Sequence, residues 1–316
     1  MASQARNHHF VPQYYLKLFS EGKSRNSNIF VTDTKKGSVF ETCPRNIGAV
    51  RDFNRIEAPG VEIDALEKAL SGFDNKVAPV LKQIARNQLL PQGYDLTILV
   101  NFVALLLVRV PAARDLYRAF HERLARETGR LLVSDENVYR SVMEKVRKQE
   151  QGSLDVAADT YEDAKQFFES GDYELFYPPG YFLAYEMEMI DAVLHPLFRM
   201  SWHLLVSSSE VFVCSDRPVS VVSGDPNHRG PVGLAMPHAE LLLPLARDMA
   251  LLGEYRGRNE GRRPVSDEIV TRINGITVAN AGRHIYSPKR IFRYHDGRTT
   301  KDSTGLTSQA SAVRAR

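Results

Sequence analysis

The chain is poor in cysteine and has no long hydrophobic run. Only two cysteines, Cys43 and Cys214, occur in 316 residues. Cysteine-based zinc sites use closely spaced pairs, and small disulfide-stabilised folds need a denser cysteine pattern. The sequence therefore excludes both. Two reduced thiols in a cytoplasmic protein are the simplest interpretation, with a single long-range disulfide as the alternative.

The most apolar stretch, Leu96–Val108, is too short to cross a bilayer, which takes about 20 apolar residues. Arg109 and Pro111 follow it directly. A helix that is apolar on nearly all sides belongs in the centre of a fold, so we expect a core helix here. The polar N-terminus lacks the apolar segment of a secretory signal. We expect no membrane association and a cytoplasmic location.

Charge is balanced over the whole chain but not along it. Lys and Arg number 41 against 38 Asp and Glu, yet from Leu251 onward 13 basic residues face 6 acidic ones. This basic C-terminal third is either a surface for nucleic acid or a nucleotide, or an ordinary solvated surface. The sequence contains no Gly-x-Gly-x-x-Gly loop, Gly-Lys-Ser/Thr loop or Gly-x-Ser-x-Gly elbow, so it has no established nucleotide-binding or hydrolase motif.

Hydrophobic periodicity predicts an α+β protein. Apolar residues in steps of three and four predict a helix over 63–84, which Pro79 should kink or divide near Lys76. Further helices are predicted over 95–126 with a bend at Pro111, and over 134–149, 161–169, 181–195 and 265–281. Strands are predicted over 28–31 and 38–42 as a hairpin, and over 202–206, 211–214, 241–245, 250–255 and 284–287. We therefore expect a predominantly helical N-terminal two-thirds packed with a small, mainly antiparallel sheet from the C-terminal third.

The adjacent histidines His8 and His9 precede a segment of large apolar side chains that needs burial. Neighbouring residues of a strand point to opposite faces, so only one of the two easily joins a given site. A metal half-site and a solvated terminus are the alternatives. We favour His9 as the functional residue.

Two charged residues stand next to apolar elements. Arg109 ends the apolar helix, where a guanidinium requires a partner: a substrate phosphate or carboxylate, or a structural carboxylate such as Asp216 or Asp52. Asp216 follows an apolar strand in a turn closed by Pro218, which suits a metal ligand or general base, or an Asx-turn.

Several segments in this order resemble the family of domain of unknown function 4238, over about residues 7–290. They are His8-His9-Phe10-Val11-Pro12-Gln13-Tyr14-Tyr15-Leu16-Lys17-Leu18-Phe19, Cys43-Pro44-Arg45-Asn46-Ile47-Gly48 with Asp52-Phe53, the helix bearing Glu62 and Glu67, Phe102 through Arg109-Val110-Pro111, Ser215-Asp216-Arg217-Pro218-Val219, Leu243-Pro244-Leu245, Asn274, and Arg283-His284-Ile285-Tyr286-Ser287-Pro288. The chain departs from the family pattern at Leu106, where a glutamine is expected, and at Asn54, where a tyrosine is expected.

The resemblance implies one domain rather than the two that the length also allows. We expect it to span residues 1–295, with 296–316 as a disordered tail that lacks apolar anchors. The resemblance also nominates His9, Asp52, Arg109, Asp216 and Asn274 as residues that the fold brings together.

We therefore expect a hydrolase-like enzyme acting on nucleic acid or a nucleotide, with a divalent metal as a possible cofactor. The expected site contains catalytic His9 and Asp216, substrate-binding Arg109 and Asn274, and supporting His8, Gln13 and Asp52. The alternative is a non-catalytic interaction or accessory protein, in stress or phage defence, in which the motifs serve the fold. A plain nucleic-acid-binding module ranks last, because the basic segment 256–263 contains no aromatic residue.

Overall fold

The computed structural model describes residues 7–56, 60, 62–149, 160–177, 181–255 and 260–307. The chain divides into two compact units, one of residues 1–113 and 183–316 and one of residues 114–182. The single domain expected over 1–295 stays a prediction.

The N-terminal part of the first unit contains three α-helices: α1 (Gln13–Leu16), α2 (Ala65–Asn87) and α3 (Gly93–Val108). The apolar run lies in α3, as predicted for a core helix, and the side chains of Leu99, Phe102 and Val103 are fully buried. The ring of Tyr15 from α1 meets that of Phe102 edge-on. Pro79 stands inside α2, which continues through it as one helix, so the predicted division does not occur.

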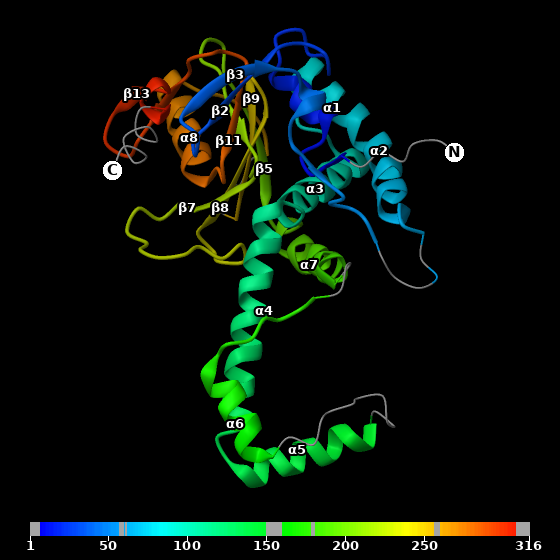
Figure 1. Ribbon diagram of the computed structural model, residues 1–316. Helices are drawn as coiled ribbons and strands as arrows, with labels where there is room; N and C mark the ends of the chain where they lie inside the picture. Colours follow the sequence, from blue (N-terminus) through cyan, green and yellow to red (C-terminus); the bar gives the residue numbers. More distant parts are fainter. Residues whose placement is uncertain are drawn as a thin grey trace. The chain divides into compact units, whose positions relative to one another are not determined.

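A five-stranded sheet lies in the C-terminal part of the same unit (Figure 1). Its strand order is β10-β5-β9-β8-β7, and all neighbours are antiparallel except β10 and β5. The strands are β5 (Ser201–Val206), β7 (Ser220–Ser223), β8 (Ala239–Ala246), β9 (Met249–Glu254) and β10 (Gly261–Pro264). Trp202 of β5 is one of the largest fully buried side chains and anchors the sheet in the main core.

A second, four-stranded sheet joins distant parts of the chain in the order β3-β2-β11-β6. Its strands are β2 (Ile29–Asp33), β3 (Ser38–Thr42), β6 (Cys214–Ser215) and β11 (His284–Ser287), and all pairs are antiparallel. The β2–β3 hairpin confirms the hairpin predicted from the sequence. The strand predicted over 211–214 is much shorter, because only Cys214 and Ser215 pair with β11.

Two short strand pairs complete the sheets. β1 (Asn7–His9) pairs with β4 (Ala49–Arg51), and β12 (Arg293–His295) pairs with β13 (Thr300–Asp302). The 3-10 turns η1 (Lys17–Phe19) and η2 (Pro44–Asn46) flank this region. β13 lies within residues 296–316, which the sequence analysis expected to be a disordered tail, and residues 308–316 lie outside the described residues.

The fold is mixed α and β, as predicted, but the two kinds of element are not segregated along the chain. The helix α8 (Asp267–Asn280) lies in the C-terminal region beside the strands (Figure 1), and its first turn is capped by the hydroxyl of Ser266. Conversely, β1 to β4 all precede the first long helix. The sequence predicted β2 and β3 but missed β1 and β4, because three-residue strands carry little periodicity.

The second unit contains most of α4 (Pro111–Leu132), with α5 (Glu136–Gln149) and α6 (Tyr161–Ser170); α7 (Tyr181–Leu197) begins here and ends in the first unit. A Cβ atom at Gly129 would lie 2.3 Å from the ring of Phe168, so glycine permits close contact between α4 and α6. The guanidinium of Arg126 donates hydrogen bonds to the carbonyls of Gly171 and Tyr173.

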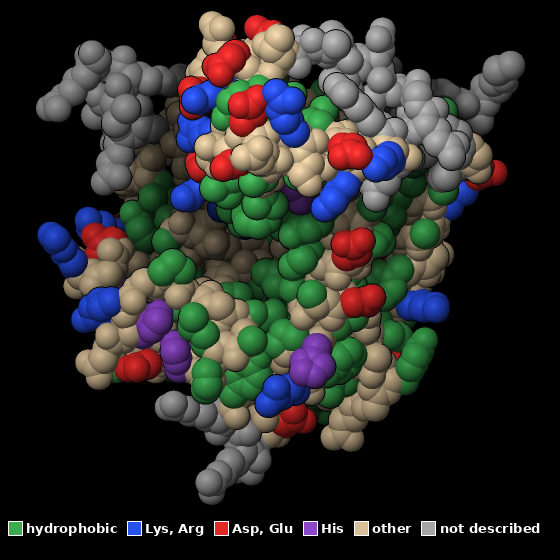
Figure 2. Space-filling view, turned by 90° about the horizontal axis from the view of Figure 1, so that it is seen from below, with side chains coloured by type: hydrophobic (Ala, Val, Ile, Leu, Met, Phe, Trp, Pro, Cys, Tyr) green, Lys and Arg blue, Asp and Glu red, His purple; other side chains and the backbone are tan. Residues whose placement is uncertain are grey.

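No single helix of the described chain has the length and apolar character of a membrane span; only α3 and α4 taken together, across their bend, reach it by length and composition. The face in Figure 2 shows hydrophobic side chains bordered by interspersed basic and acidic ones. This face presents no continuous basic surface among the described residues.

Candidate functional site

The N-terminal motif is held in place by Gly48. The backbone N–H groups of Phe10 and Val11 both donate to the Gly48 carbonyl, at 2.9 and 3.1 Å. Gly48 has a φ of +67°, and a Cβ atom there would lie 3.0 Å from the Val11 carbonyl oxygen. A residue with a side chain would be strained at this position, so glycine is required for the close approach that orients His8 and His9.

The two histidines have different surroundings, as expected for neighbours in a strand. His8 is buried, and its Nδ1 accepts a hydrogen bond of 2.8 Å from the backbone N–H of Asn54. His9 instead lines a small cavity of about 180 Å³. The polar residues of this cavity, which we call the His9 pocket, are His9, Gln13, Tyr14, Glu67, Asp74 and Arg109; its apolar residues are Phe10, Pro12 and Leu70.

Arg109 is almost fully buried, with 3% of its surface exposed. One terminal nitrogen donates a hydrogen bond to the side-chain oxygen of Asn54, and Nε lies 3.7 Å from a carboxylate oxygen of the fully buried Glu186. The Asn54 side-chain nitrogen donates in turn to Glu67 at 2.5 Å. Asn54 therefore links Arg109, Glu67 and, through its backbone, His8.

The titratable groups of the His9 pocket are shifted by burial. Burial lowers the pKa of His9, and this outweighs the Arg45 backbone and Glu67, which raise it. Nδ1 of the ring lies 3.4 Å from the Gln13 side-chain nitrogen, while Nε2 is buried and makes no well-formed hydrogen bond with the residues that the structure describes. At neutral pH the imidazole is thus uncharged and able to accept a proton.

Asp74 is shifted in the opposite sense. Burial raises the pKa of its carboxyl group, and the nearby Glu67 raises it further, although a hydrogen bond of 2.8 Å from the Tyr14 hydroxyl lowers it. Burial and the carboxylate of Asp74 also raise the pKa of Tyr14. A neutral base and a carboxyl group of raised pKa consequently share one small pocket.

The sequence analysis did not nominate Glu67, Asp74, Tyr14, Asn54 or Glu186 as site residues. A signal for two of them was present, since Glu67 and Asp74 lie seven residues apart on α2 with Leu70 between them, and this spacing places all three on one helix face. Asn54 and Glu186 offered no such signal, because each reaches the site only through contacts with residues distant in the sequence.

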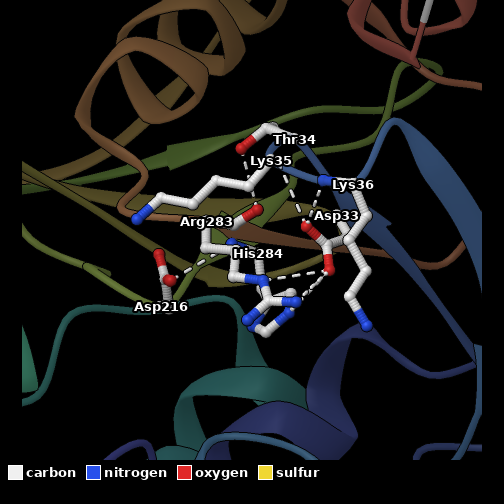
Figure 3. A network of polar contacts seen from close by, with 7 residues as sticks. All are labelled: Asp33, Thr34, Lys35, Lys36, Asp216, Arg283 and His284. Atoms are coloured by element: carbon white, nitrogen blue, oxygen red, sulfur yellow. Dashed lines mark hydrogen bonds and ion pairs between the residues drawn. The ribbon is translucent and has the colours of Figure 1, made fainter. Parts of the chain in front are cut away.

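Asp216 belongs to a different network (Figure 3). Its carboxylate accepts hydrogen bonds from the backbone N–H groups of Gly282 and His284, at 2.8 and 3.1 Å. Next to it, the carboxylate of Asp33 accepts two hydrogen bonds from the Arg283 guanidinium, at 2.9 and 2.7 Å. These contacts connect the ends of β2, β6 and β11.

Asp33 is buried, and burial alone would raise its pKa. The hydrogen bonds from Arg283 and from the Lys36 backbone outweigh burial and hold the pKa at about 2. Asp33 is therefore a stable anion that fixes the position of Arg283.

Asn274 and Asp52 make local and structural contacts. The fully buried Asn274 side chain accepts a hydrogen bond from the Val213 backbone and donates to the Val211 and Arg293 carbonyls. Asp52 has a φ of +58° in the turn after β4, and its carboxylate pairs with Arg51 at 3.5 Å.

Of the predicted site residues, the structure brings His9, Gln13 and Arg109 together in the pocket lining, with His8 attached through Asn54. Asp52, Asp216 and Asn274 are not part of that lining. Within the described residues, no group of three or more His, Cys, Asp or Glu side chains is arranged to hold a metal ion. The composition of the pocket fits proton transfer.

Comparison with known proteins identifies a family and no named relative. No curated protein and no solved structure gives a significant match to the chain. The family model described as protein of unknown function (DUF4238) matches residues 7–290. The match covers nearly the whole chain and includes every residue of the His9 pocket. The chain belongs to the DUF4238 family.

Proposed function

We propose that the protein is a hydrolase-like enzyme and that the His9 pocket is its active site. One observation carries the proposal: an uncharged imidazole and a carboxyl group of raised pKa line the same cavity. Environments that push titratable groups toward neutrality in a pocket are typical of acid–base catalysis.

In this mechanism the His9 imidazole takes a proton from a water molecule. The resulting hydroxide attacks the electrophilic centre of the substrate, and the bond to the leaving group breaks. The His9 imidazolium, which the neighbouring Glu67 stabilises, then gives this proton to the leaving group, and Asp74 lines the same cavity. Arg109, Asn54 and Glu67 position the pocket walls around the reacting groups.

The size of the pocket bears on the substrate. A volume of about 180 Å³ is smaller than the roughly 300 to 1,000 Å³ of sites that enclose a whole drug-sized ligand. A nucleotide would therefore place only one end in the pocket. Nucleic acid and nucleotides, which the sequence favoured, remain substrates to be tested beside small esters and amides.

The experiment is a hydrolysis screen of the purified protein against carboxylic esters, amides, phosphoesters, nucleotides and RNA, with and without divalent metal. The His9→Gln variant should lower kcat by about 100-fold or more, the usual contribution of general acid–base catalysis, and Asp74→Asn, which changes a lining residue, should lower kcat by a smaller factor. His195→Gln, at an exposed histidine, serves as the matched control. Full activity of His9→Gln, or no turnover of any substrate class, would overturn the proposal.

The alternative function, a non-catalytic interaction or accessory protein, is favoured by a different observation. Leu116, Phe120 and Leu124 follow one another at four-residue intervals on α4 and are 67%, 57% and 51% exposed. Such a spacing places them on one helix face, and large apolar side chains exposed together are typical of interaction surfaces. An inactive protein that associates through this face, and dissociates on Phe120→Glu in light-scattering measurements, would support this alternative.

A further inference from the structure

The His9 pocket contains Arg109, but its net charge is not positive. The lining contains two carboxylates, Glu67 and Asp74, and one guanidinium, Arg109. That guanidinium already pairs with the buried carboxylate of Glu186. Because burial lowers the pKa of His9, the imidazole adds no compensating charge at neutral pH. The pocket therefore has an excess of negative charge.

The two carboxylates also retain hydrogen-bonding capacity. Among the described residues, the Asn54 side chain donates to one oxygen of Glu67, and the Tyr14 hydroxyl donates to one oxygen of Asp74. The second oxygen of each carboxylate is left for a ligand. A group with several N–H donors and a positive charge satisfies both, whereas a phosphate or carboxylate ligand meets repulsion from both.

The remaining lining fits such a group as well. Phe10, Pro12 and Leu70 form the apolar part of the cavity, which suits the methylene stem of an alkylamine or alkylguanidine. At about 30 Å³ per water molecule, a cavity of about 180 Å³ has room for a guanidinium and a short stem and for little more.

We propose that the His9 pocket recognises a small cationic group, an ammonium or guanidinium, at the end of its substrate. The inference rests on the proposed function, since the cationic group belongs to the molecule that the enzyme cleaves. Glu67 and Asp74 bind the charge, and the apolar residues hold the stem. This assigns the pocket a substrate of the opposite charge to the phosphate that Arg109 suggested from the sequence.

The test uses simple probes with the full-length protein. Methylguanidine and ethylamine are the cationic probes, and inorganic phosphate and acetate are the anionic probes, all titrated at constant ionic strength and neutral pH and followed by NMR chemical shifts. We expect saturable binding of methylguanidine and none of phosphate. Tighter binding of phosphate than of methylguanidine would overturn the inference without the need for any variant.

Two substitutions locate the binding. Glu67→Gln and Asp74→Asn should each weaken methylguanidine binding by at least tenfold. Glu62→Gln removes an exposed carboxylate that lies just before α2 and should leave the affinity unchanged. Thermal unfolding of each variant verifies folding. Equal affinity in wild type, Glu67→Gln and Asp74→Asn would contradict the proposed site.

The outcomes separate this inference from the proposed function. Methylguanidine binding that depends on Glu67 and Asp74, in a protein that hydrolyses no substrate, would support the cationic site and overturn the hydrolase. Hydrolysis that depends on His9 but shows no preference for cationic over neutral or anionic substrates would support the hydrolase and overturn the cationic site.

Discussion

The guanidinium of Arg109 and the carboxylate of Glu186 form an ion pair in the interior of the protein. Nε and Oε2 lie 3.7 Å apart, and the two side chains are 3% and 0% exposed. The pair joins the C-terminal end of α3 to α7, and more than seventy residues of sequence separate its two members. Removing either partner would leave a buried charge without its counter-ion.

We expect Glu186→Ala to lower the free energy of unfolding by about 3 to 5 kcal/mol, the usual effect of breaking a buried ion pair. Urea denaturation measures it. The matched control is Glu136→Ala, which breaks the exposed pair of Glu136 and Arg140 and should cost less than about 1 kcal/mol. Equal losses in the two variants would show that burial adds nothing to the Arg109–Glu186 pair.

Asn54→Ala tests the residue that connects the pocket. It removes the acceptor of the Arg109 hydrogen bond and the donor to Glu67. Because buried polar groups lose their partners, we expect a loss of about 1 to 3 kcal/mol in the free energy of unfolding. The same substitution at the exposed Asn46, which also makes side-chain hydrogen bonds, should have a smaller effect. A neutral outcome at Asn54 would mean that water replaces its contacts.

The lowered pKa of His9 predicts a dependence of stability on pH. In the unfolded chain the imidazole has its ordinary pKa of 6.5, and in the folded chain burial makes it lower. Between these two values the unfolded state binds more protons, so the free energy of unfolding falls as the pH decreases below 6.5. The His9→Gln variant should lack this part of the slope. Denaturation at several pH values between about 7.5 and 5 compares the two proteins, and parallel curves would contradict the shift.

Asp33→Asn tests a second loss of stability with falling pH, in a more acidic range than that of His9. The Asp33 carboxyl has a pKa of about 2 in the folded chain, against 3.8 ordinarily. Its stabilisation is therefore present above pH 3.8 and is lost as the pH falls toward 2. At neutral pH the substitution should cost about 1 to 3 kcal/mol, because hydrogen bonds from Arg283 to a charged group are weakened. A wild-type advantage that persists unchanged in acid would exclude Asp33 as its source.

Asn274→Ala separates a structural role from substrate binding. Its three hydrogen bonds tie α8 to the segments at Val211, Val213 and Arg293, so we expect a loss of about 2 to 4 kcal/mol in stability. The affinity for methylguanidine should be unchanged in the folded variant. A loss of methylguanidine affinity with normal stability would show that Asn274 takes part in ligand binding.

Of the polar residues that line the His9 pocket, the sequence analysis named His9, Gln13 and Arg109 as site residues, because their local context is informative. His9 was found from strand alternation, and Arg109 from the cost of a guanidinium at the end of an apolar helix. Asp216 showed the limits of that approach. A carboxylate after an apolar strand suits a catalytic base, but the backbone donors that satisfy Asp216 come from Gly282 and His284, and only the pairing of β6 with β11 brings them there.

The partner of Arg109 could not be predicted for the same reason. Glu186 lies within α7, and an acidic residue inside a helix is usually exposed to solvent. Its complete burial depends on packing between helices that are far apart in the sequence. The fold class, by contrast, follows from short-range periodicity, and the long helices and the β2–β3 hairpin were predicted nearly to their ends.

The link between Asp33 and Arg283 has a consequence for synthesis of the chain, since 250 residues separate the two. The β2–β3 hairpin leaves the ribosome early, whereas β11, which pairs with the other edge of β2, is among the last strands made. At about 5 to 20 residues per second the nascent hairpin waits roughly 12 to 50 seconds with one edge unpaired. An open strand edge is a site for association with other chains. Yield of the native protein should therefore respond to translation speed and to chaperones that cover nascent chains.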